Sequence, residues 1–302
     1  MPEPKPAPED PKVALQKIVN TKAYMTSLFK GGVIVVVHDS DHAKLAERLG
    51  ARGLIIGNAM RKGIDNEHVV SAAGPAVVRD ILSSVLLPTI GRVRVGHIAE
   101  AQMMEACGCD GVDEHEGMAA TGAKTYKKFN TKIPFIAGVS TLDTALKAIF
   151  EGASMIRTSC GADEDKPDIK LTANTIKTIY AGINRYVKMT KPELDAEMVA
   201  KGHSQTMIAL IKQCVTLKKL PVPLFADGGI MLPMDAAMMM SLGADGVIAS
   251  VQVFQAADPA RRIRSIVMAV AHHDNAGKLA GICEDNGGLG VAINYKAVAA
   301  PK

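Results

Sequence analysis

The sequence predicts a (β/α)8 TIM barrel, in which eight parallel strands close into a barrel covered by helices. Short apolar runs alternate with amphipathic segments between residues 30 and 280, a pattern typical of a parallel sheet covered by helices. Of the 302 residues, 48% are hydrophobic and only 4% aromatic, which favours an α/β protein over an aromatic-cored sandwich. No G-x-G-x-x-G motif follows the first apolar run, so the barrel is preferred to an open doubly wound sheet.

The predicted elements follow one another in a regular order. Residues 1–12 are proline-rich and are expected to be a disordered tail. Residues 13–29 have apolar side chains at helical spacing, which predicts an amphipathic helix outside the barrel. The barrel is expected over residues 30–280 and a C-terminal tail over 281–302. The eight predicted strands are GGVIVVV (31–37), GLIIG (53–57), LPTIGRV (87–93), GVDEHE (111–116), IPFIAGV (133–139), SMIRT (154–158), VPLFADGGI (222–230) and DGVIAS (245–250).

Helices are predicted after nearly all of these strands. The first, SDHAKLAERLG (40–50), has Ser40 at the expected N-cap position and Gly50 at the expected C-terminal stop. The others are GPAVVRDILSSV (74–85), HIAEAQMMEACG (97–108), TLDTALKAIFEG (141–152), a segment after Pro167, PMDAAMMMSLG (233–243) and DPARRIRSIVMAVAHH (258–273).

Composition argues against several classes of protein. The net charge of +4 is small and spread along the chain, so we expect no nucleic-acid binding. The lysine cluster KTYKK (124–128) is expected to be a solvated loop. No apolar run approaches the roughly 20 residues that span a bilayer, and the N-terminus lacks the apolar core of a signal peptide. The five cysteines form no regular framework, which is typical of reduced thiols. We expect a cytoplasmic protein without a metal, a cofactor or a membrane segment.

A barrel of this kind carries its function at the C-terminal ends of its strands. These ends are residues 36–39, 57–58, 91–97, 113–116, 138–140, 157–161, 227–229 and 249–252. At one of them, Gly228 and Gly229 precede a helix, which is typical of a loop whose backbone N–H groups hold a phosphate. Glycines needed only for a tight turn are the alternative explanation.

Several longer blocks carry a family likeness. They are KGGVI (30–34), RVGHIAEAQ (94–102), DEHE (113–116), EGASMIRT (151–158), the glycine-rich block 228–247 and VFQAADPARRIRSIVMAVAHHD (253–274). Together they resemble the synthase subunit of the glutaminase-dependent pyridoxal 5'-phosphate synthase, the PdxS/Snz family of vitamin B6 biosynthesis. The resemblance covers residues from about 22 to about 280.

The resemblance implies a (β/α)8 barrel that assembles as a homo-oligomer, a hexamer or a dodecamer. It implies a lyase-like reaction that combines a pentose phosphate, a triose phosphate and ammonia into pyridoxal phosphate. A partner glutaminase supplies the ammonia and docks near the N-terminal helix. Imines form on two lysines, at the ends of the third and sixth strands, and an aspartate at the end of the first strand assists.

This chain departs from the family pattern at the positions to which the resemblance assigns catalysis. Arg92 stands at the third-strand lysine, Ser159 at the sixth-strand lysine and Val36 at the first-strand aspartate. An imine requires an amine that can lose its proton, whereas arginine stays protonated at any working pH. Serine forms no imine, and valine accepts no proton. The catalytic positions are therefore expected to be degenerate.

The phosphate loops depart as well. Gly161 is followed by the acidic residues of GADED, which would repel a phosphate dianion. Ser250 begins SVQ, where the family has a small glycine-serine-glycine loop, and Ser140 replaces an arginine. Gly161, Gly228, Gly229 and Ser250 are therefore expected to form a degenerate phosphate site.

Six residues that suit a site are retained. They are Arg94, His97, Glu100, Asp113, Glu116 and Arg157. They are either remnants of catalysis or an arginine–carboxylate network that stabilises the loops at the barrel mouth. The structural explanation is preferred, and His97 is expected to cap the following helix in either case.

The preferred hypothesis is a pseudoenzyme that assembles with a catalytic PdxS-type paralogue and regulates or stabilises it. One alternative is an active synthase that uses relocated lysines, with Lys62, Lys124 and Lys166 as candidates. A second is a barrel enzyme that binds a cationic or neutral ligand at the acidic segments DEHE and ADEDKPD. A third is a structural, self-assembling ring.

Overall fold

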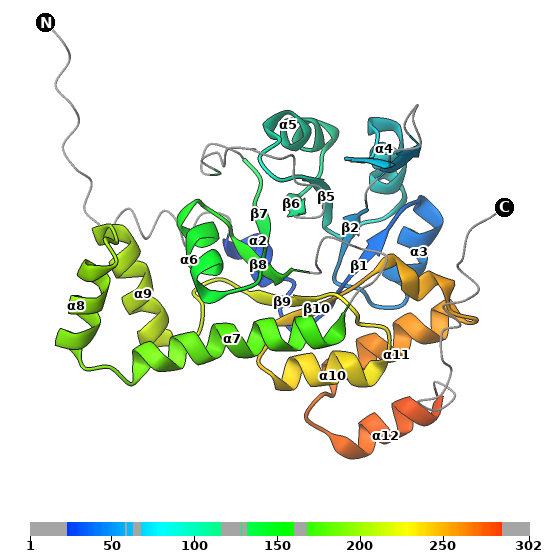
Figure 1. Ribbon diagram of the computed structural model, residues 1–302. Helices are drawn as coiled ribbons and strands as arrows, with labels where there is room; N and C mark the ends of the chain where they lie inside the picture. The colour runs from blue at the N-terminus through cyan, green and yellow to red at the C-terminus, as the bar shows by residue number, and fades with distance from the viewer. Residues whose placement is uncertain are drawn as a thin grey trace, which may run out of the picture.

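Eight parallel strands close into a barrel in the computed structural model (Figure 1), which describes residues 23–57, 59–62, 68–115, 128, 132–159 and 168–285. Neighbouring strands follow the order β1-β10-β9-β8-β7-β6-β5-β2 around the barrel. The strands are β1 (Val33–Val37), β2 (Gly53–Ile56), β5 (Thr89–Arg94), β6 (Gly111–His115), β7 (Phe135–Val139), β8 (Met155–Thr158), β9 (Leu224–Asp227) and β10 (Gly246–Ala249). All eight predicted strands are present, and the predicted fold class is confirmed.

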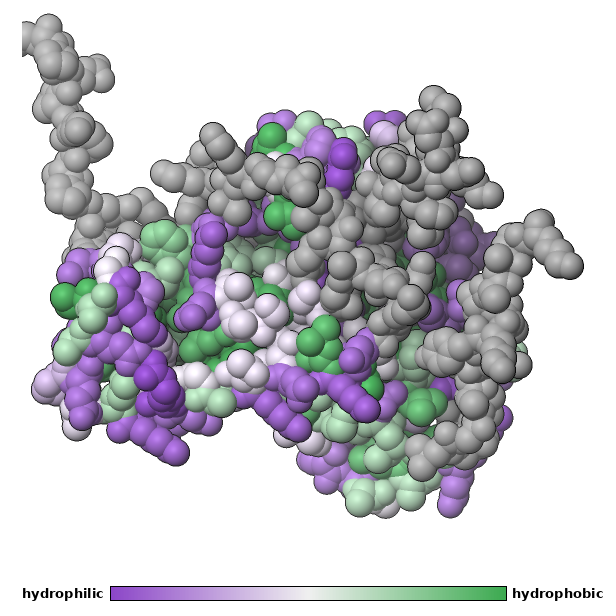
Figure 2. All heavy atoms as spheres, viewed as in Figure 1, coloured by the Kyte–Doolittle hydropathy of each residue, from purple (hydrophilic) through white to green (hydrophobic). Residues whose placement is uncertain are grey.

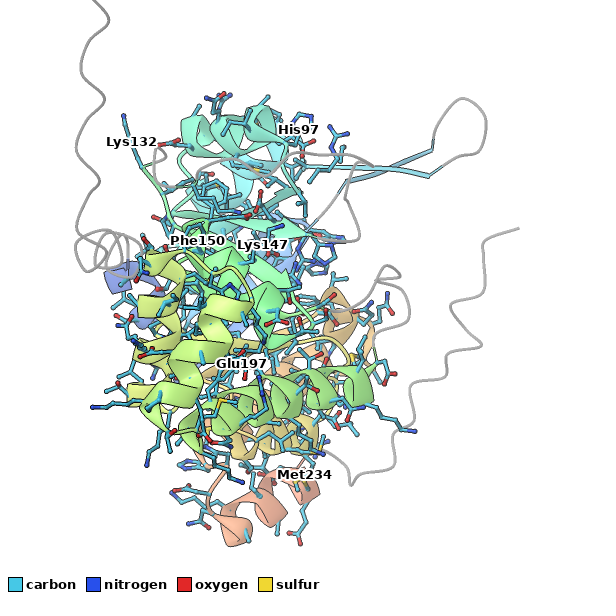
Figure 3. All side chains as sticks on the ribbon, turned by 60° about the vertical axis from the view of Figure 1, so that its left-hand side comes forward. His97, Lys132, Lys147, Phe150, Glu197 and Met234 are labelled. Carbon is cyan, nitrogen blue, oxygen red and sulfur yellow. The ribbon has the colours of Figure 1, made fainter. Side chains whose placement is uncertain are left out.

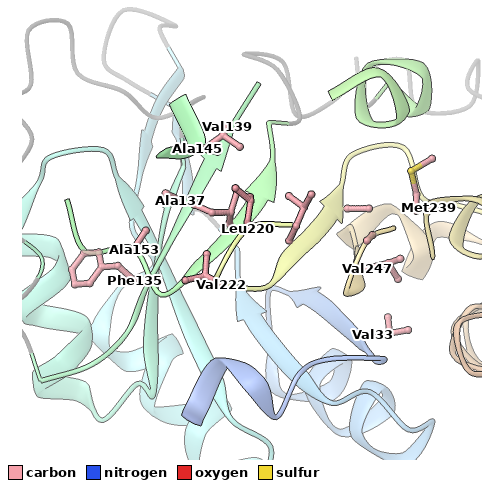
Figure 4. Packing of buried hydrophobic residues seen from close by; sticks show 14 of the residues in the cluster. Val33, Phe135, Ala137, Val139, Ala145, Ala153, Leu220, Val222, Met239 and Val247 are labelled. Carbon is pink, nitrogen blue, oxygen red and sulfur yellow. The ribbon is translucent and has the colours of Figure 1, made fainter. Parts of the chain in front are cut away.

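Side chains of the barrel strands point alternately inward and outward, because successive residues of a strand face opposite sides. The inward set includes Ile34, Ile90, Met155 and Phe225, which form one buried cluster inside the barrel. The outward set forms a second, larger cluster between the strands and the helices. Figure 4 shows part of this outer layer, including Val33, Phe135 and Val247. This alternation decides which strand residues reach the interior.

Helices cover the outside of the barrel (Figure 1). They are α3 (Ser40–Arg48), α4 (Pro75–Ser84), α5 (Ile98–Cys107), α6 (Leu142–Phe150), α7 (Ile169–Val187), α10 (Pro233–Ser241) and α11 (Pro259–Ala271). The prediction of Ser40 as the N-cap of the first helix is wrong, since Asp39 is the N-cap and accepts a hydrogen bond from the His42 N–H at 2.7 Å. Gly50 follows that helix with a φ of 92°, as expected of a glycine stop.

Several elements extend the basic barrel. An antiparallel hairpin, β3 (Ala59–Lys62) and β4 (His68–Ser71), follows β2. Helices α8 (Lys191–Ala200) and α9 (Gln205–Leu217) separate α7 from β9. Figure 2 shows hydrophilic residues gathered over α8 and the adjoining part of α7, where Glu197 pairs with Arg185 and Lys201. A short 3-10 helix, η3 (Val251–Gln255), follows β10.

The two ends of the described chain bear on the predicted boundaries. Helix α2 (Ala23–Ser27) falls within the predicted helix 13–29, of which residues 13–22 lie outside the described residues. Phe29 follows α2 and belongs to the cluster inside the barrel. Helix α12 (Ala276–Asp285) packs on α10 and α11 and runs through the boundary predicted between residues 280 and 281. Within the described residues, no helix is long and apolar enough to cross a membrane.

Candidate functional site

Four charged side chains from four strands meet inside the barrel. Arg92 of β5, Asp113 of β6, Arg157 of β8 and Asp227 of β9 are at most 5% exposed. Each lies two residues beyond an inner position of its strand, so the alternation of the strands turns it inward, toward the C-terminal mouth. We call these four residues the inner cluster. It stands where a barrel enzyme would keep its reactive groups.

Asp113 joins the two arginines of the inner cluster. Arg92 Nε donates a hydrogen bond to Asp113 Oδ2 at 2.8 Å, and Arg157 Nε donates to Oδ1 at 2.7 Å. Burial alone would raise the pKa of Asp113, but the guanidinium groups of Arg157 and Arg92 outweigh that effect and hold the pKa at about 2. Asp113 is therefore an ionised carboxylate that two arginines hold from both sides.

Asp227 is held by the same arginines at longer distances. Its Oδ2 lies 3.3 Å from Arg157 Nη1 and 3.7 Å from Arg92 Nη2. Burial raises the pKa of Asp227, and the neighbouring Asp113 carboxylate adds to that effect, while Arg157 and Arg92 oppose it. Two carboxyl groups in one cluster thus have pKa values shifted in opposite directions.

A second group of polar residues lies where β5 leads into α5. Arg94 donates from Nε to Glu100 Oε1 at 2.9 Å, and its backbone N–H donates to Glu100 Oε2 at 2.9 Å. Burial raises the pKa of Glu100, but the hydrogen bonds from Arg94 prevail and lower it. His97, labelled in Figure 3, accepts the Glu100 N–H at Nδ1 and is the N-cap of α5. Arg94, His97 and Glu100 therefore bind one another.

Val36 and Ser159, the other two positions expected to be degenerate, carry no charged side chain. Val36 is buried in the apolar cluster inside the barrel, against which Val251 of η3 also packs. Ser159 follows β8, and its backbone N–H donates to the Val139 carbonyl at 2.8 Å. The apolar side chains of Val36 and Val251 therefore lie at the barrel mouth beside β1.

Packing accounts for the glycine pair at the end of β9. Gly228 and Gly229 have φ values of 106° and 74°, which favour glycine. A side chain at Gly229 would lie 2.4 Å from the backbone nitrogen of Ile169, the first residue of α7. Thr172 donates to the carbonyls of Asp227 and Gly228 at 2.7 and 2.9 Å. The loop is thus packed against the start of α7. Nearby, Ser250 is the N-cap residue of η3.

Within the described residues, the acidic side chains of the segment DEHE form ion pairs inside the protein. Asp113 belongs to the inner cluster, and Glu114 points to the other side of β6. There Lys128 Nζ lies 2.9 Å from Glu114 Oε2 and 3.6 Å from Glu151 Oε2, with Lys128 only 3% exposed. These carboxylates are already paired, so they do not favour a site for a cationic ligand.

Two important contributors were missed by the sequence analysis. Asp227 was identified as a strand end but not as a site residue, although its place two residues after the inward Phe225 was a usable signal. Lys128 was assigned to a solvated lysine-rich loop, but it is buried with two glutamates. That prediction is wrong, because the glutamates belong to β6 and to the end of α6, which meet Lys128 only in the folded protein.

Several predicted positions lie outside the described residues. These are Glu116, Gly161, Lys124 and Lys166, and nothing is described of the Lys62 side chain in β3. None of the eight barrel strands contains a lysine. In the described part of the chain, no group of three or more histidine, cysteine, aspartate or glutamate residues could hold a metal ion.

Comparison with known proteins identifies the family. The model of the SOR/SNZ family matches residues 18–227. The model of the thiazole biosynthesis protein ThiG matches residues 200–287.

Curated relatives are similar over nearly the whole chain. The pyridoxal 5'-phosphate synthase subunit PdxS of Herpetosiphon aurantiacus is 35% identical, over 92% of this chain and 94% of the relative. The subunit PdxS of Thermotoga maritima is 36% identical, over 88% and 90%. The probable pyridoxal 5'-phosphate synthase subunit PDX1 of Ginkgo biloba is 34% identical, over 91% and 88%. The family match and these relatives together show that the chain belongs to the SOR/SNZ family.

Proposed function

We propose that this chain is a non-catalytic member of its family, a pseudoenzyme of pyridoxal 5'-phosphate biosynthesis. The observation that carries the proposal is the state of Arg92. This residue stands where the family resemblance places an imine-forming lysine, and it is buried and hydrogen-bonded to Asp113 at 2.8 Å. A guanidinium held in this way is neither an amine nor free to reach a carbonyl carbon.

The other two substituted positions support the same conclusion. Ser159 has no amine, and Val36 packs in an apolar cluster where an aspartate would be needed. The strands that build the barrel supply no lysine in exchange. Substitution at three positions that the resemblance assigns to catalysis, beside a closed eight-stranded barrel, supports a protein that keeps the fold without the reaction.

The retained scaffold supports a role in assembly. We propose that the chain forms a homo-oligomer, a hexamer or a dodecamer, in the cytoplasm and joins a catalytic PdxS-type paralogue, which it stabilises or regulates. The glutaminase subunit is a further candidate partner. The outward apolar layer and the helices that cover the barrel are intact, so surfaces that carry an assembly can persist after the mouth has changed.

Intact-protein mass spectrometry after incubation with a pentose phosphate and ammonium tests the loss of chemistry. We expect no covalent adduct on this chain after reduction with borohydride, while the Thermotoga maritima subunit serves as the control under the same conditions. An adduct on this chain would overturn the proposal. Peptide mapping would then show whether Lys62, Lys124 or Lys166 has taken over the reaction.

Co-expression with a catalytic relative from the same cell tests the assembly. We expect capture of a tag on this chain to yield mixed rings, whose composition native mass spectrometry reads directly. Rings made only of this chain would contradict joint assembly and favour the self-assembling ring. This outcome is independent of the adduct experiment, so the two parts of the proposal fail separately.

A further inference from the structure

The inner cluster holds two carboxyl groups in unequal environments. Asp113 receives one short hydrogen bond on each oxygen, at 2.8 and 2.7 Å, from the Nε atoms of both arginines. Asp227 Oδ2 is equally buried, yet it accepts no hydrogen bond from a described residue and lies 3.3 and 3.7 Å from guanidinium nitrogens. Hydrogen bonds stabilise the charged form of a carboxyl group, and burial without them destabilises it. Asp113 therefore keeps its charge more readily than Asp227.

We propose that Asp227 is the proton-exchanging group of the inner cluster, so that the charge of the barrel mouth depends on pH. When Asp227 is protonated, two guanidinium groups face the single carboxylate of Asp113. When it is ionised, the charges of the four side chains balance. The proposal does not depend on the catalytic state of the protein, since it concerns only these buried groups.

Among the described residues, the charged and titratable groups that act on Asp227 come from strands β5, β6 and β8. Arg157 of β8 and Arg92 of β5 favour the ionised form, and His115 of β6 acts in the same direction. Burial and Asp113 of β6 favour the protonated form and prevail, so the pKa of Asp227 is raised. The backbone of Asp227 is fixed separately, since Thr158 Oγ1 accepts its N–H at 2.7 Å. The side chain can therefore change charge while β9 stays in place.

The expected pH dependence has a definite sign. A carboxyl group whose pKa is raised on folding binds protons more tightly in the folded state than in the unfolded state. The stability of the protein therefore falls as the pH rises above 3.8, the pKa of an aspartate in the unfolded chain. Asp113 has its pKa lowered and acts in the opposite direction. Substitution of the two residues should therefore change the pH dependence of unfolding in opposite ways.

Infrared spectroscopy of protein labelled with [4-13C]aspartate tests the protonation state directly. At mildly acidic pH, where exposed aspartates are ionised, we expect a protonated-carboxyl stretch that the D227N variant lacks. Asp235, a half-buried residue of α10 whose pKa burial also raises, provides the matched control. The band should persist in D235N. Its absence from the wild-type protein, or its complete loss in D235N, would overturn the proposal.

Urea unfolding across the same pH range provides the second test. Relative to wild type, the midpoint of D227N should move to higher urea as the pH rises, because a neutral amide has no charge to bury. The midpoint of D113N should move to lower urea. A D227N variant that loses stability with rising pH as D113N does would refute the proposal. If D227N does not fold, the spectra of wild type and D235N still decide the question.

Discussion

Replacement of Asp113 by asparagine gives the sharpest test of the inner cluster. The carboxylate is fully buried and joins Arg92 and Arg157 through two short hydrogen bonds. Asparagine has nearly the same shape, so the change removes charge and one acceptor without creating a large cavity. Both guanidinium groups then remain buried without the carboxylate that joined them, and the Asp227 carboxylate lies farther away, at 3.3 and 3.7 Å.

The expected loss of stability can be estimated in two ways. Removal of one partner from a buried ion pair typically costs about 3–5 kcal/mol in the free energy of unfolding. The pKa of Asp113 gives a lower figure, because a shift from 3.8 to about 2 corresponds to about 2 kcal/mol of preference for the charged form. We expect D113N to be less stable than wild type by about 3–5 kcal/mol at neutral pH.

Urea unfolding at neutral and at acidic pH is the assay. The contribution of Asp113 is complete above its unfolded pKa of 3.8 and is lost as the pH falls toward about 2. The difference between wild type and D113N should therefore shrink by about 2 kcal/mol over that interval. Asp143, an exposed residue of α6, is the control, and D143N should stay within about 0.5 kcal/mol of wild type. Equal midpoints for D113N and wild type at neutral pH would refute the reasoning.

Three further substitutions test neighbouring features. R92K retains the charge but loses the hydrogen bond from Arg92 Nε to Asp113. The free energy of unfolding, measured by chemical denaturation, should fall by about 1–3 kcal/mol. An unchanged free energy of unfolding would contradict this account. G229A forces a side chain against the start of α7, at a residue whose φ is 74°. It should lower the free energy of unfolding by at least about 1–3 kcal/mol in the same assay. G281A is the control, because Gly281 on α12 has open space around it, and this variant should be neutral or stabilising. K128M leaves Glu114 buried without its cation and should lower the free energy of unfolding by about 3–5 kcal/mol, whereas an unchanged thermal midpoint would show that the pair is dispensable.

Some features of the site were predictable because their signals are local. The apolar runs identified all eight barrel strands, and the position of His97 between a strand and a helix identified it as a cap. The sequence also indicated Gly50 as the stop of the first barrel helix, where the backbone φ is 92°. Each of these predictions depends on a few residues that are adjacent in the chain, where hydrogen-bonding and steric preferences act directly.

Other features depended on signals that a short segment does not contain. Ser40 was predicted to cap α3, but Asp39 has the extended backbone and the carboxylate that accepts the His42 N–H. Lys128 was predicted to be solvated, because a lysine-rich run usually is, yet two glutamates from β6 and the end of α6 surround it. Tertiary contacts overrode the local preference in the second case.

The sequence by itself determined the barrel, the order of its elements, the family and the absence of lysine from the eight barrel strands. Only the tertiary structure decided that Arg92 and Arg157 share Asp113, and that Asp227 joins them from β9. The physical reason is the closure of the sheet. Alternation along each strand determines which side chains point inward. Their positions along the barrel axis, and therefore their partners, depend on the register between strands that are distant in the chain.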